Sequence, residues 1–163
     1  VGKTTRDGRQ SGNLAGTKHG ALGAFVATLR ETLVERIAAQ ARQQAGIDPA
    51  YIAPTPAQWH LNLWATVLDP NGHQDPHLHP SGWLSGVYYL RAPTRADDHA
   101  GWIEFGVPPA VLCGGNANAG KQARPPEGPL PTFPSYLYHR TVPHRDDGLR
   151  ISLAFDVVPL PGG

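Results

Sequence analysis

The fold is decided by one stretch, HQDPHLHPSGWLSGVYYL, which spans residues 73–90. Side chains that can bind a metal ion or move a proton stand there at every second position: His73, Asp75, His77 and His79. In an extended backbone, alternate side chains point to the same face. Two neighbours in this series could therefore hold one ion, because imidazole and carboxylate are common metal ligands. The alternative is a solvated, histidine-rich loop.

An apolar segment, Trp83–Leu90, follows this cluster directly and predicts a strand that would hold it on a rigid element. Upstream, residues 59–67 alternate between apolar and polar side chains, which predicts another strand, and Asp69–Gly72 predicts a turn after it. Further strands are predicted at Gly101–Phe105, Tyr136–Val142 and Leu149–Val158. Short strands separated by glycine and proline favour an antiparallel sandwich or barrel.

One strong helix is predicted at Ala21–Ala45, where apolar residues recur at a spacing of three or four and charged residues take the other side. Gly46 supplies its C-terminal stop. We expect the apolar stripe to pack on one face of the sheet. Residues 1–20 are polar and rich in glycine, so we expect a flexible segment unless it packs on the sheet.

A long segment, Val107–Gly128, is rich in Gly, Pro, Asn and Ala and shows no period. Loops of this length are often functional lids or disordered. We expect a mobile rim over the mouth of the barrel.

A second polar group lies near the C-terminus. The turn signal Asp146-Asp147-Gly148 predicts that segments 136–142 and 149–158 form a hairpin. Alternation along the last segment puts Arg150 and Ser152 on the face opposite the apolar residues. An arginine in this position faces either water or a small polar cavity, where its planar fork suits a carboxylate.

Length and composition limit the possible classes. The 163 residues are enough for one domain with a real core. The net charge is +1 and the 14 Lys and Arg residues form no dense stripe, so we expect no nucleic-acid partner. The chain has neither a long apolar run nor an N-terminal secretory segment, so we expect no membrane span. The single Cys113 excludes an internal disulfide and suits the cytoplasm. Because methionine is absent even at position 1, we expect a fragment or a trimmed chain.

Four motifs, taken together, carry a resemblance to a known family. They are His77-Leu78-His79-Pro80, Ser85-Gly86-Val87-Tyr88-Tyr89-Leu90, Phe133-Pro134-Ser135 and Arg150-Ile151-Ser152. As a set they resemble Fe(II)/2-oxoglutarate-dependent oxygenases, and more narrowly a bacterial and phage family of such enzymes, over residues 59–158. The resemblance implies a mainly β fold in a single domain, residues 1–163. It would consist of a double-stranded β-helix, or jelly roll, over residues 57–158, with the helix of residues 21–46 packed on its sheet.

The resemblance also implies a site and a reaction. The implied iron ligands are His77, His79 and His139, and the implied 2-oxoglutarate-binding residues are Arg150, Ser152 and Tyr89. Arg150 would bind the remote carboxylate of 2-oxoglutarate. The implied activity is oxidative decarboxylation of 2-oxoglutarate coupled to hydroxylation of a substrate, with Fe(II) and 2-oxoglutarate carrying the chemistry. The sequence identifies neither the primary substrate nor the oligomeric state.

The chain departs from the superfamily pattern at one ligand. The usual set is two histidines and one carboxylate, and the position expected to hold the carboxylate is His79. A literal His-x-Asp lies one step upstream, so His73 and Asp75 are the alternate ligands; Asp75 would otherwise orient an imidazole. For the distal ligand the rival of His139 is His144, for which we expect a solvated role in the turn.

Two other functions stay open. One is a three-histidine metal enzyme of the cupin type that uses no 2-oxoglutarate, in which Arg150 has no role. The other is a non-catalytic jelly-roll binding module with Trp64, Trp83 and Trp102 as a carbohydrate platform. Iron content and succinate release from 2-oxoglutarate separate these functions.

Overall fold

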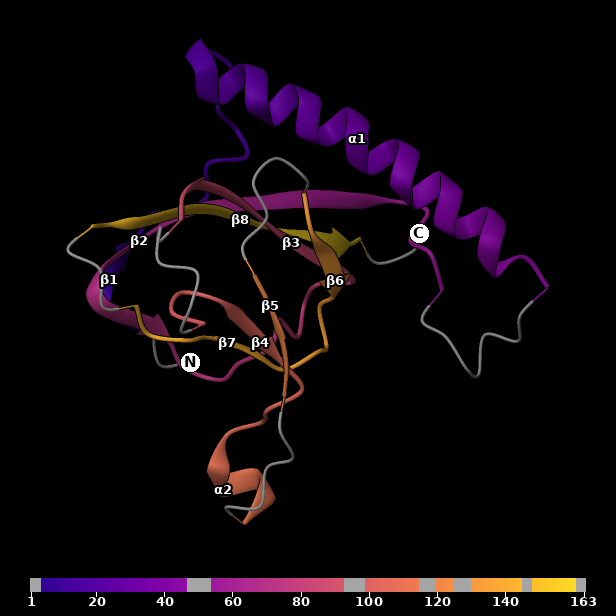
Figure 1. The fold of residues 1–163 in the computed structure, drawn as a ribbon. Helices are drawn as coiled ribbons and strands as arrows, with labels where there is room; N and C mark the ends of the chain where they lie inside the picture. The colour runs from indigo at the N-terminus through magenta and orange to yellow at the C-terminus, as the bar shows by residue number, and fades with distance from the viewer. Residues whose placement is uncertain are drawn as a thin grey trace.

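The computed structural model describes residues 4–46, 54–92, 99–114, 120–124, 130–144 and 148–160. In these ranges the strands form two antiparallel sheets, and a long helix covers the larger one (Figure 1). The larger sheet has the order β1 (Thr5–Gln10), β2 (Trp59–Gln74), β8 (Arg150–Pro159), β3 (Leu84–Arg91) and β6 (Thr132–Pro134). The smaller sheet has the order β5 (Lys121–Ala123), β4 (Ile103–Phe105) and β7 (His139–Thr141). The predicted architecture is confirmed: the chain is a mainly β jelly roll with its N-terminal helix packed on the sheet.

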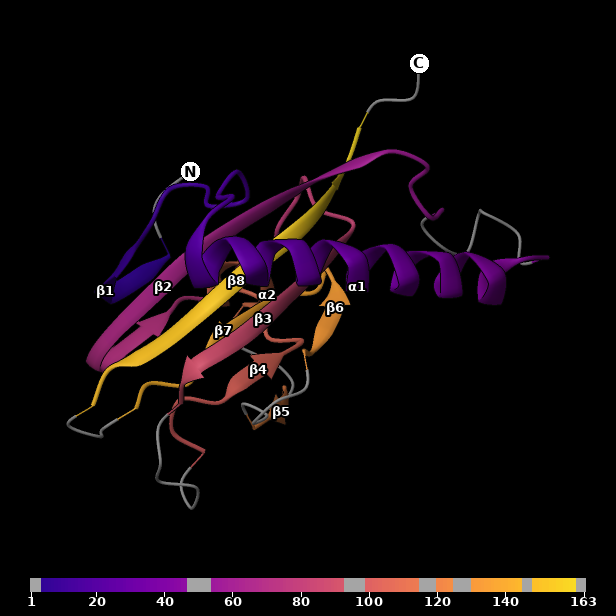
Figure 2. The ribbon, with the colours of Figure 1, turned by 90° about the horizontal axis from the view of Figure 1, so that it is seen from above.

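Helix α1 (Gly20–Gln44) forms the outer layer and runs across β2, β8 and β3 (Figure 2). Its bounds lie within one residue of the predicted ones, and Gly46 follows it with a φ of +85°. The buried side chains of the predicted stripe pack against those of β2 and β8; the set is Val26, Leu29, Leu33, Ile37, Leu61, Leu63, Leu153, Phe155 and Val157. Burying each large apolar side chain contributes about 1.5–3 kcal/mol, so this layer holds the sheet rigid behind the site.

Strand β8 is the central strand of the larger sheet, with β2 on one side and β3 on the other. Its alternation matches the prediction: Leu153 and Phe155 face α1. Arg150 and Ser152 face the space between the two sheets instead. Phe155 lies so close to β3 that a Cβ on Gly86 would come within 2.3 Å of its ring. The glycine of the Ser85-Gly86 motif is therefore required by packing.

The predicted hairpin of segments 136–142 and 149–158 is wrong. Both edges of β8 are occupied by β2 and β3, whereas β7 pairs with β4 in the other sheet. The chain therefore crosses from one sheet to the other between these strands. As a result, His139 and Arg150 line the space between the sheets from two sides.

The predicted turn at Asp69–Gly72 is also wrong, because β2 continues through it. Strand β1 pairs with β2 on both sides of these residues, through Gly8↔Leu68 and Arg6↔His73. Residues 69–72 of β2 therefore form a bulge opposite Asp7. Asn71 takes a positive φ of 67°, and a Cβ on Gly72 would lie 2.3 Å from the carbonyl oxygen of Asp7. Strand β1 thus packs on the sheet, so the expectation of a flexible segment does not hold for residues 5–10.

The segment Val107–Gly128 is not entirely irregular, since it contains α2 (Ala110–Cys113) and β5. Residues 115–119 and 125–128 of this segment lie outside the described residues, and its role as a mobile rim stays a prediction. Strand β6 was missed because it is short and contains Pro134, which a strand tolerates at the edge of a sheet. In the described residues, neither helix combines the length and apolar character needed to span a membrane.

Candidate metal centre

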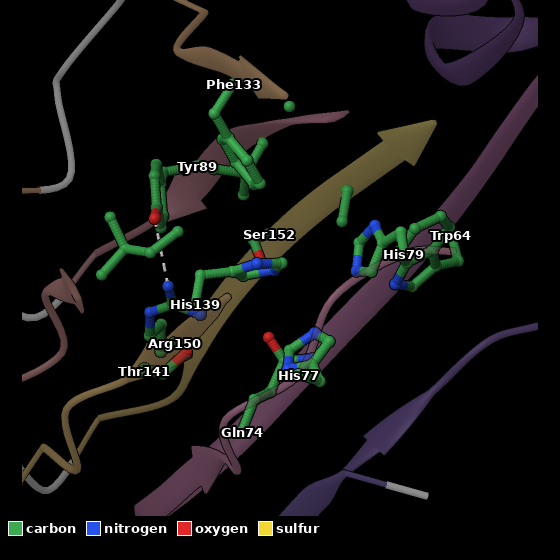
Figure 3. A pocket seen from close by; sticks show the side chains of 14 residues that line it. Trp64, Gln74, His77, His79, Tyr89, Phe133, His139, Thr141, Arg150 and Ser152 are labelled. Carbon is green, nitrogen blue, oxygen red and sulfur yellow. Dashed lines mark hydrogen bonds between the residues drawn. The ribbon is translucent and has the colours of Figure 1, made fainter. Parts of the chain in front are cut away.

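Three histidines converge between the sheets. His77, His79 and His139 each offer a ring nitrogen, and these nitrogens lie within 4.8 Å of one another. The ring centroids of His77 and His139 are 4.3 Å apart, and that of His79 lies 5.2 Å from His77 and 5.0 Å from His139 (Figure 3). Histidine nitrogens at such separations suit a single divalent metal ion.

The backbone brings these histidines together. His77 and His139 form an isolated antiparallel bridge in which each backbone N–H donates to the other's carbonyl oxygen at 2.9 Å. The backbone N–H of His79 donates to the carbonyl oxygen of Ser135, also at 2.9 Å. The segment after β2 is thus fixed to the segment that enters β7. A cluster built on paired backbone keeps its geometry without a metal.

Two of the imidazoles are held in a defined tautomer. His77 Nδ1 lies 2.7 Å from the carbonyl oxygen of Asp75, and His139 Nδ1 lies 3.0 Å from that of Leu137. A carbonyl oxygen only accepts, so Nδ1 carries the proton in both rings. Nε2 is then the nitrogen whose lone pair is free for a metal ion.

Burial keeps these rings neutral. The pKa of His139 is lowered to about 3, mainly by desolvation and then by the neighbouring His77. Desolvation likewise lowers the pKa of His77, against a backbone hydrogen bond to Asp75 that raises it. Neutral imidazole is the form that binds a metal ion, so these two rings are ready to bind one near neutral pH.

The third ring, His79, has a carboxylate partner that sequence reasoning missed. Its Nδ1 lies 2.6 Å from Asp156 Oδ1 and 3.1 Å from Ser85 Oγ. Ser85 Oγ donates to the same carboxylate oxygen at 2.6 Å. Asp156 stands on β8, four positions after Ser152. By the alternation of the strand, it lies on the same face as Arg150 and Ser152. Extending the period-two pattern to residue 156 would have placed it on that face, but not shown that it is buried against His79.

The alternate ligands lie outside this group. The carboxylate of Asp75 is bound by Arg6 on β1, at 2.6 and 2.7 Å, and lies 3.5 Å from His73 Nε2. The contact of Asp75 with the imidazole of His77 is made by its backbone carbonyl and not by its carboxylate. Neither His73 nor Asp75 belongs to the histidine group found in the described residues.

The rival distal histidine, His144, is also separate from the group. The expectation that it is solvated is wrong, because its exposed fraction is 0%. Its carbonyl oxygen accepts a hydrogen bond of 2.7 Å from the backbone N–H of Asn71. Contact with the bulge of β2, which the sequence did not reveal, accounts for its burial.

Arg150 is the second feature of the site. It is 2% exposed, and its guanidinium donates to the carbonyl oxygen of Gly101 at 3.3 Å and to the Tyr89 hydroxyl at 3.1 Å. Among the described residues, no acidic side chain forms an ion pair with it. Ser152, 2% exposed, is the cross-strand neighbour of Tyr89. Tyr89 and Ser152 therefore line the same space as a buried cation that has no acidic partner in the described part of the chain.

A narrow chamber joins these two features. Its walls include the three histidines, Arg150, Tyr89 and Ser152, with Phe133 and Thr141 between them (Figure 3). A wider cleft of about 360 Å³ lies against His77 and His79, and its lining includes Trp64, Gln74 and, from the N-terminal segment, Thr4 and Gln10. His77 and His79 line both spaces. The candidate centre thus borders a narrow chamber and a wider, more open cleft.

The proposed carbohydrate platform does not assemble. Trp64 lines the chamber, Trp83 packs against the core under α1, and Trp102 has its ring against His99. Trp64 and Trp83 thus lie on opposite faces of the larger sheet.

A family model described as "Putative 2OG-Fe(II) oxygenase" matches residues 62–156, more than half of the chain. The matched span contains the three clustered histidines, Arg150 and Asp156. No curated protein matches the sequence.

Solved structures share the fold at low sequence identity. A Pseudomonas putida prolyl-4-hydroxylase is similar with a TM-score of 0.59 and 14% identity, covering 94% of this chain and 72% of that one. The viral collagen prolyl hydroxylase of Paramecium Bursaria Chlorella virus-1, in complex with 2OG, has a TM-score of 0.60 and 11% identity, covering 96% and 82%. HygX from Streptomyces hygroscopicus, with nickel and 2-oxoglutarate bound, has a TM-score of 0.62 and 14% identity, covering 98% and 72%.

Proposed function

This chain belongs to the 2OG-Fe(II) oxygenase family, and we propose that it couples oxidative decarboxylation of 2-oxoglutarate to hydroxylation of a second substrate. In this proposal His77, His79 and His139 hold Fe(II), and Arg150 binds the remote carboxylate of 2-oxoglutarate. The observation that carries it is the burial of Arg150 in a chamber walled on another side by the three histidines.

The residues present fit an iron ion. Three imidazole nitrogens within 4.8 Å of one another would hold one such ion. The set lacks the carboxylate of the usual triad, and Asp156 behind His79 provides a negative charge nearby. When bound, the iron and 2-oxoglutarate would supply the oxidation by O2: CO2 leaves 2-oxoglutarate, one oxygen atom enters succinate and the other enters the hydroxylated product.

The residues around Arg150 fit a carboxylate. A buried cation without an anionic partner costs several kcal/mol of desolvation, which a bound carboxylate would offset. The guanidinium can meet a carboxylate with two parallel hydrogen bonds. Because the Tyr89 hydroxyl accepts from Arg150, its own proton stays available to donate to the same carboxylate. Ser152 adds a hydroxyl from the adjacent strand.

With the side chains in their present positions, the chamber is small. Its volume of about 30 Å³ has room for about one or two water molecules. A five-carbon diacid would therefore enter by displacing water and moving flexible lining side chains, such as Gln74 and Tyr89. Such a fit would exclude solvent from the reacting groups once the diacid is bound.

The open cleft is the proposed entry for the second substrate, because it reaches the same histidines from outside the chamber. Its lining offers amides and hydroxyls from Gln10, Asn62, Gln74 and Ser81 and one indole ring from Trp64. Among the described residues that line it, the one ionisable group besides the histidines is Asp156, whose carboxylate is hydrogen-bonded to His79. The lining favours an uncharged, hydrogen-bonding group over an anion.

The test is the turnover of 2-oxoglutarate by purified protein loaded anaerobically with Fe(II) and then exposed to O2. We expect succinate to form even without the second substrate, at a low uncoupled rate, and to depend on added iron. Iron-loaded protein that neither binds nor decarboxylates 2-oxoglutarate would contradict the proposal. That outcome would favour the three-histidine enzyme of the cupin type, for which the three clustered histidines are also suited.

A further inference from the structure

A chain of hydrogen bonds extends from the outer side of His79 into the sheet. His79 Nδ1 and Ser85 Oγ both lie 2.6 Å from Asp156 Oδ1. Because the Ser85 proton goes to the carboxylate, the hydroxyl of Ser135, 2.7 Å away, donates to Ser85 Oγ. Ser85 and Ser135 belong to motifs that the proposed metal and diacid sites do not use.

This chain of hydrogen bonds is buried and tightly packed. Ser85 and Ser135 are 0% exposed, and Asp156 is 8% exposed. A Cβ on Gly82 would come within 2.5 Å of Ser135 Oγ, so the glycine leaves the space that the serine fills. Ser85 lies on β3, Asp156 on β8 and Ser135 in the segment before β7. The backbone of each is hydrogen-bonded to a neighbouring segment, which holds its side chain in place. Asp156 is therefore held in one position toward His79.

Asp156 carries a buried charge without a permanent counterion. In the part of the chain that the structure describes, its ion-pair partner is His79, and neither a Lys nor an Arg side chain forms an ion pair with it. A buried carboxylate is costly unless a positive charge lies nearby. A metal ion on the far side of the imidazole would provide that charge, and the carboxylate would make the imidazole a stronger ligand.

We propose that Asp156 is a positioning residue that supplies, through His79, the negative charge that a direct carboxylate ligand would give to the metal. The inference rests on the proposed metal site. Two neutral imidazoles and one carboxylate carry a charge of −1, and three neutral imidazoles with Asp156 behind one of them carry the same charge. His79 and Asp156 thus act together as the third ligand, and Ser85 and Ser135 keep the carboxylate in place. This role of holding the Asp156 carboxylate explains why Ser85 and Ser135 are buried beside it.

The first test measures Co(II) binding by the purified full chain, since Co(II) has a visible d–d spectrum and needs no turnover. Asp156→Asn keeps the shape and an acceptor oxygen for His79 but removes the charge. We expect it to weaken Co(II) binding by about 10- to 100-fold, the range for partners of a metal ligand. The control is Glu31→Gln, which removes an exposed carboxylate on α1 outside the site, and we expect a change of less than about threefold.

The decisive test places the same change in a His79→Asp background. There a direct carboxylate ligand supplies the charge, and Asp156 becomes a second carboxylate beside it. We expect Asp156→Asn to leave Co(II) affinity unchanged or raise it in that background, because it removes a like-charge repulsion. A purely structural role predicts the same loss in both backgrounds. Equal loss in both, or wild-type affinity in Asp156→Asn alone, would overturn the inference.

Thermal unfolding of each metal-free variant separates a loss of folding from a loss of binding. A folded Asp156→Asn variant with weakened Co(II) binding supports the inference even if the wild-type protein does not turn over 2-oxoglutarate. Conversely, 2-oxoglutarate turnover by the wild-type protein with no effect of Asp156→Asn on Co(II) binding supports the proposed function and contradicts the inference.

Discussion

Arg150 and Asp156 project from the same face of β8, and neither has a partner of opposite permanent charge among the described residues. They are six positions apart along the extended strand, a distance of about 20 Å. One strand therefore carries a buried cation at the far wall of the chamber and a buried carboxylate that is hydrogen-bonded to His79 and Ser85. In the proposed enzyme the diacid compensates the first charge and the metal ion the second.

The ligand assignment predicts which substitutions remove the metal. His77→Ala and His139→Ala should each abolish stoichiometric Fe(II) binding, because each removes one of three ring nitrogens within 4.8 Å. Iron content after anaerobic reconstitution and desalting measures this. Full iron occupancy in both variants would show that the ligands lie elsewhere.

The identity of the third metal ligand, His79 rather than Asp75, is a separate prediction. His79→Ala should weaken Fe(II) binding far more than Asp75→Ala, since the carboxylate of Asp75 is engaged by Arg6. Both variants are compared by iron titration under identical conditions. A larger loss for Asp75→Ala would make Asp75 the third ligand and require its side chain to turn inward.

The buried histidines predict a pH dependence of the metal-free protein. The folded-state pKa of His139, about 3, lies below its ordinary value of 6.5. Between these values the unfolded chain binds a proton that the folded protein does not, so stability falls as pH decreases below about 6.5, by at most about 1.4 kcal/mol per pH unit from this residue. The lowered pKa of His77 adds in the same direction.

Urea unfolding of the metal-free protein at several pH values between about 7.5 and 5 tests this prediction. His139→Gln lacks the titrating ring and should show a shallower dependence. Equal slopes for the two proteins would contradict the assignment of the pH effect to His139.

Packing predicts a specific cost at Gly86. A Cβ there would lie 2.3 Å from the ring of Phe155, which is 0% exposed and cannot move away freely. Gly86→Ala should therefore destabilise the protein by about 1–3 kcal/mol, as for overpacking in a core. The matched control is Gly12→Ala, where a Cβ meets nothing within 4 Å, and its effect should be within about 1 kcal/mol of zero. Equal free energies of unfolding for the two variants would contradict this account of the motif.

Local patterns in the sequence predicted the helix, the strands β2, β3 and β8 and the face on which Arg150 lies, because period-two and helical spacing depend on neighbouring residues. They did not predict which strands pair. The proposed hairpin failed because β7 joins β4, a choice made by distant contacts. Asp156 was missed for a related reason: its partner His79 lies 77 positions away, and a buried acid in a strand has the same spacing as an exposed one. The buried His144 likewise contacts the bulge in β2, where the local sequence pattern predicted a turn instead.

The central claim is that Arg150 binds the remote carboxylate of 2-oxoglutarate next to a three-histidine iron site. The most direct measurement is 2-oxoglutarate affinity and succinate formation by the wild-type protein, Arg150→Ala and Arg150→Lys, with iron content assayed in parallel. We expect Arg150→Ala to keep its iron and to lose about 2–5 kcal/mol of 2-oxoglutarate binding, as for a truncated buried charge pair. Arg150→Lys should recover only part, because a point charge cannot make the paired hydrogen bonds. Unchanged 2-oxoglutarate affinity in an iron-loaded Arg150→Ala protein would contradict the claim.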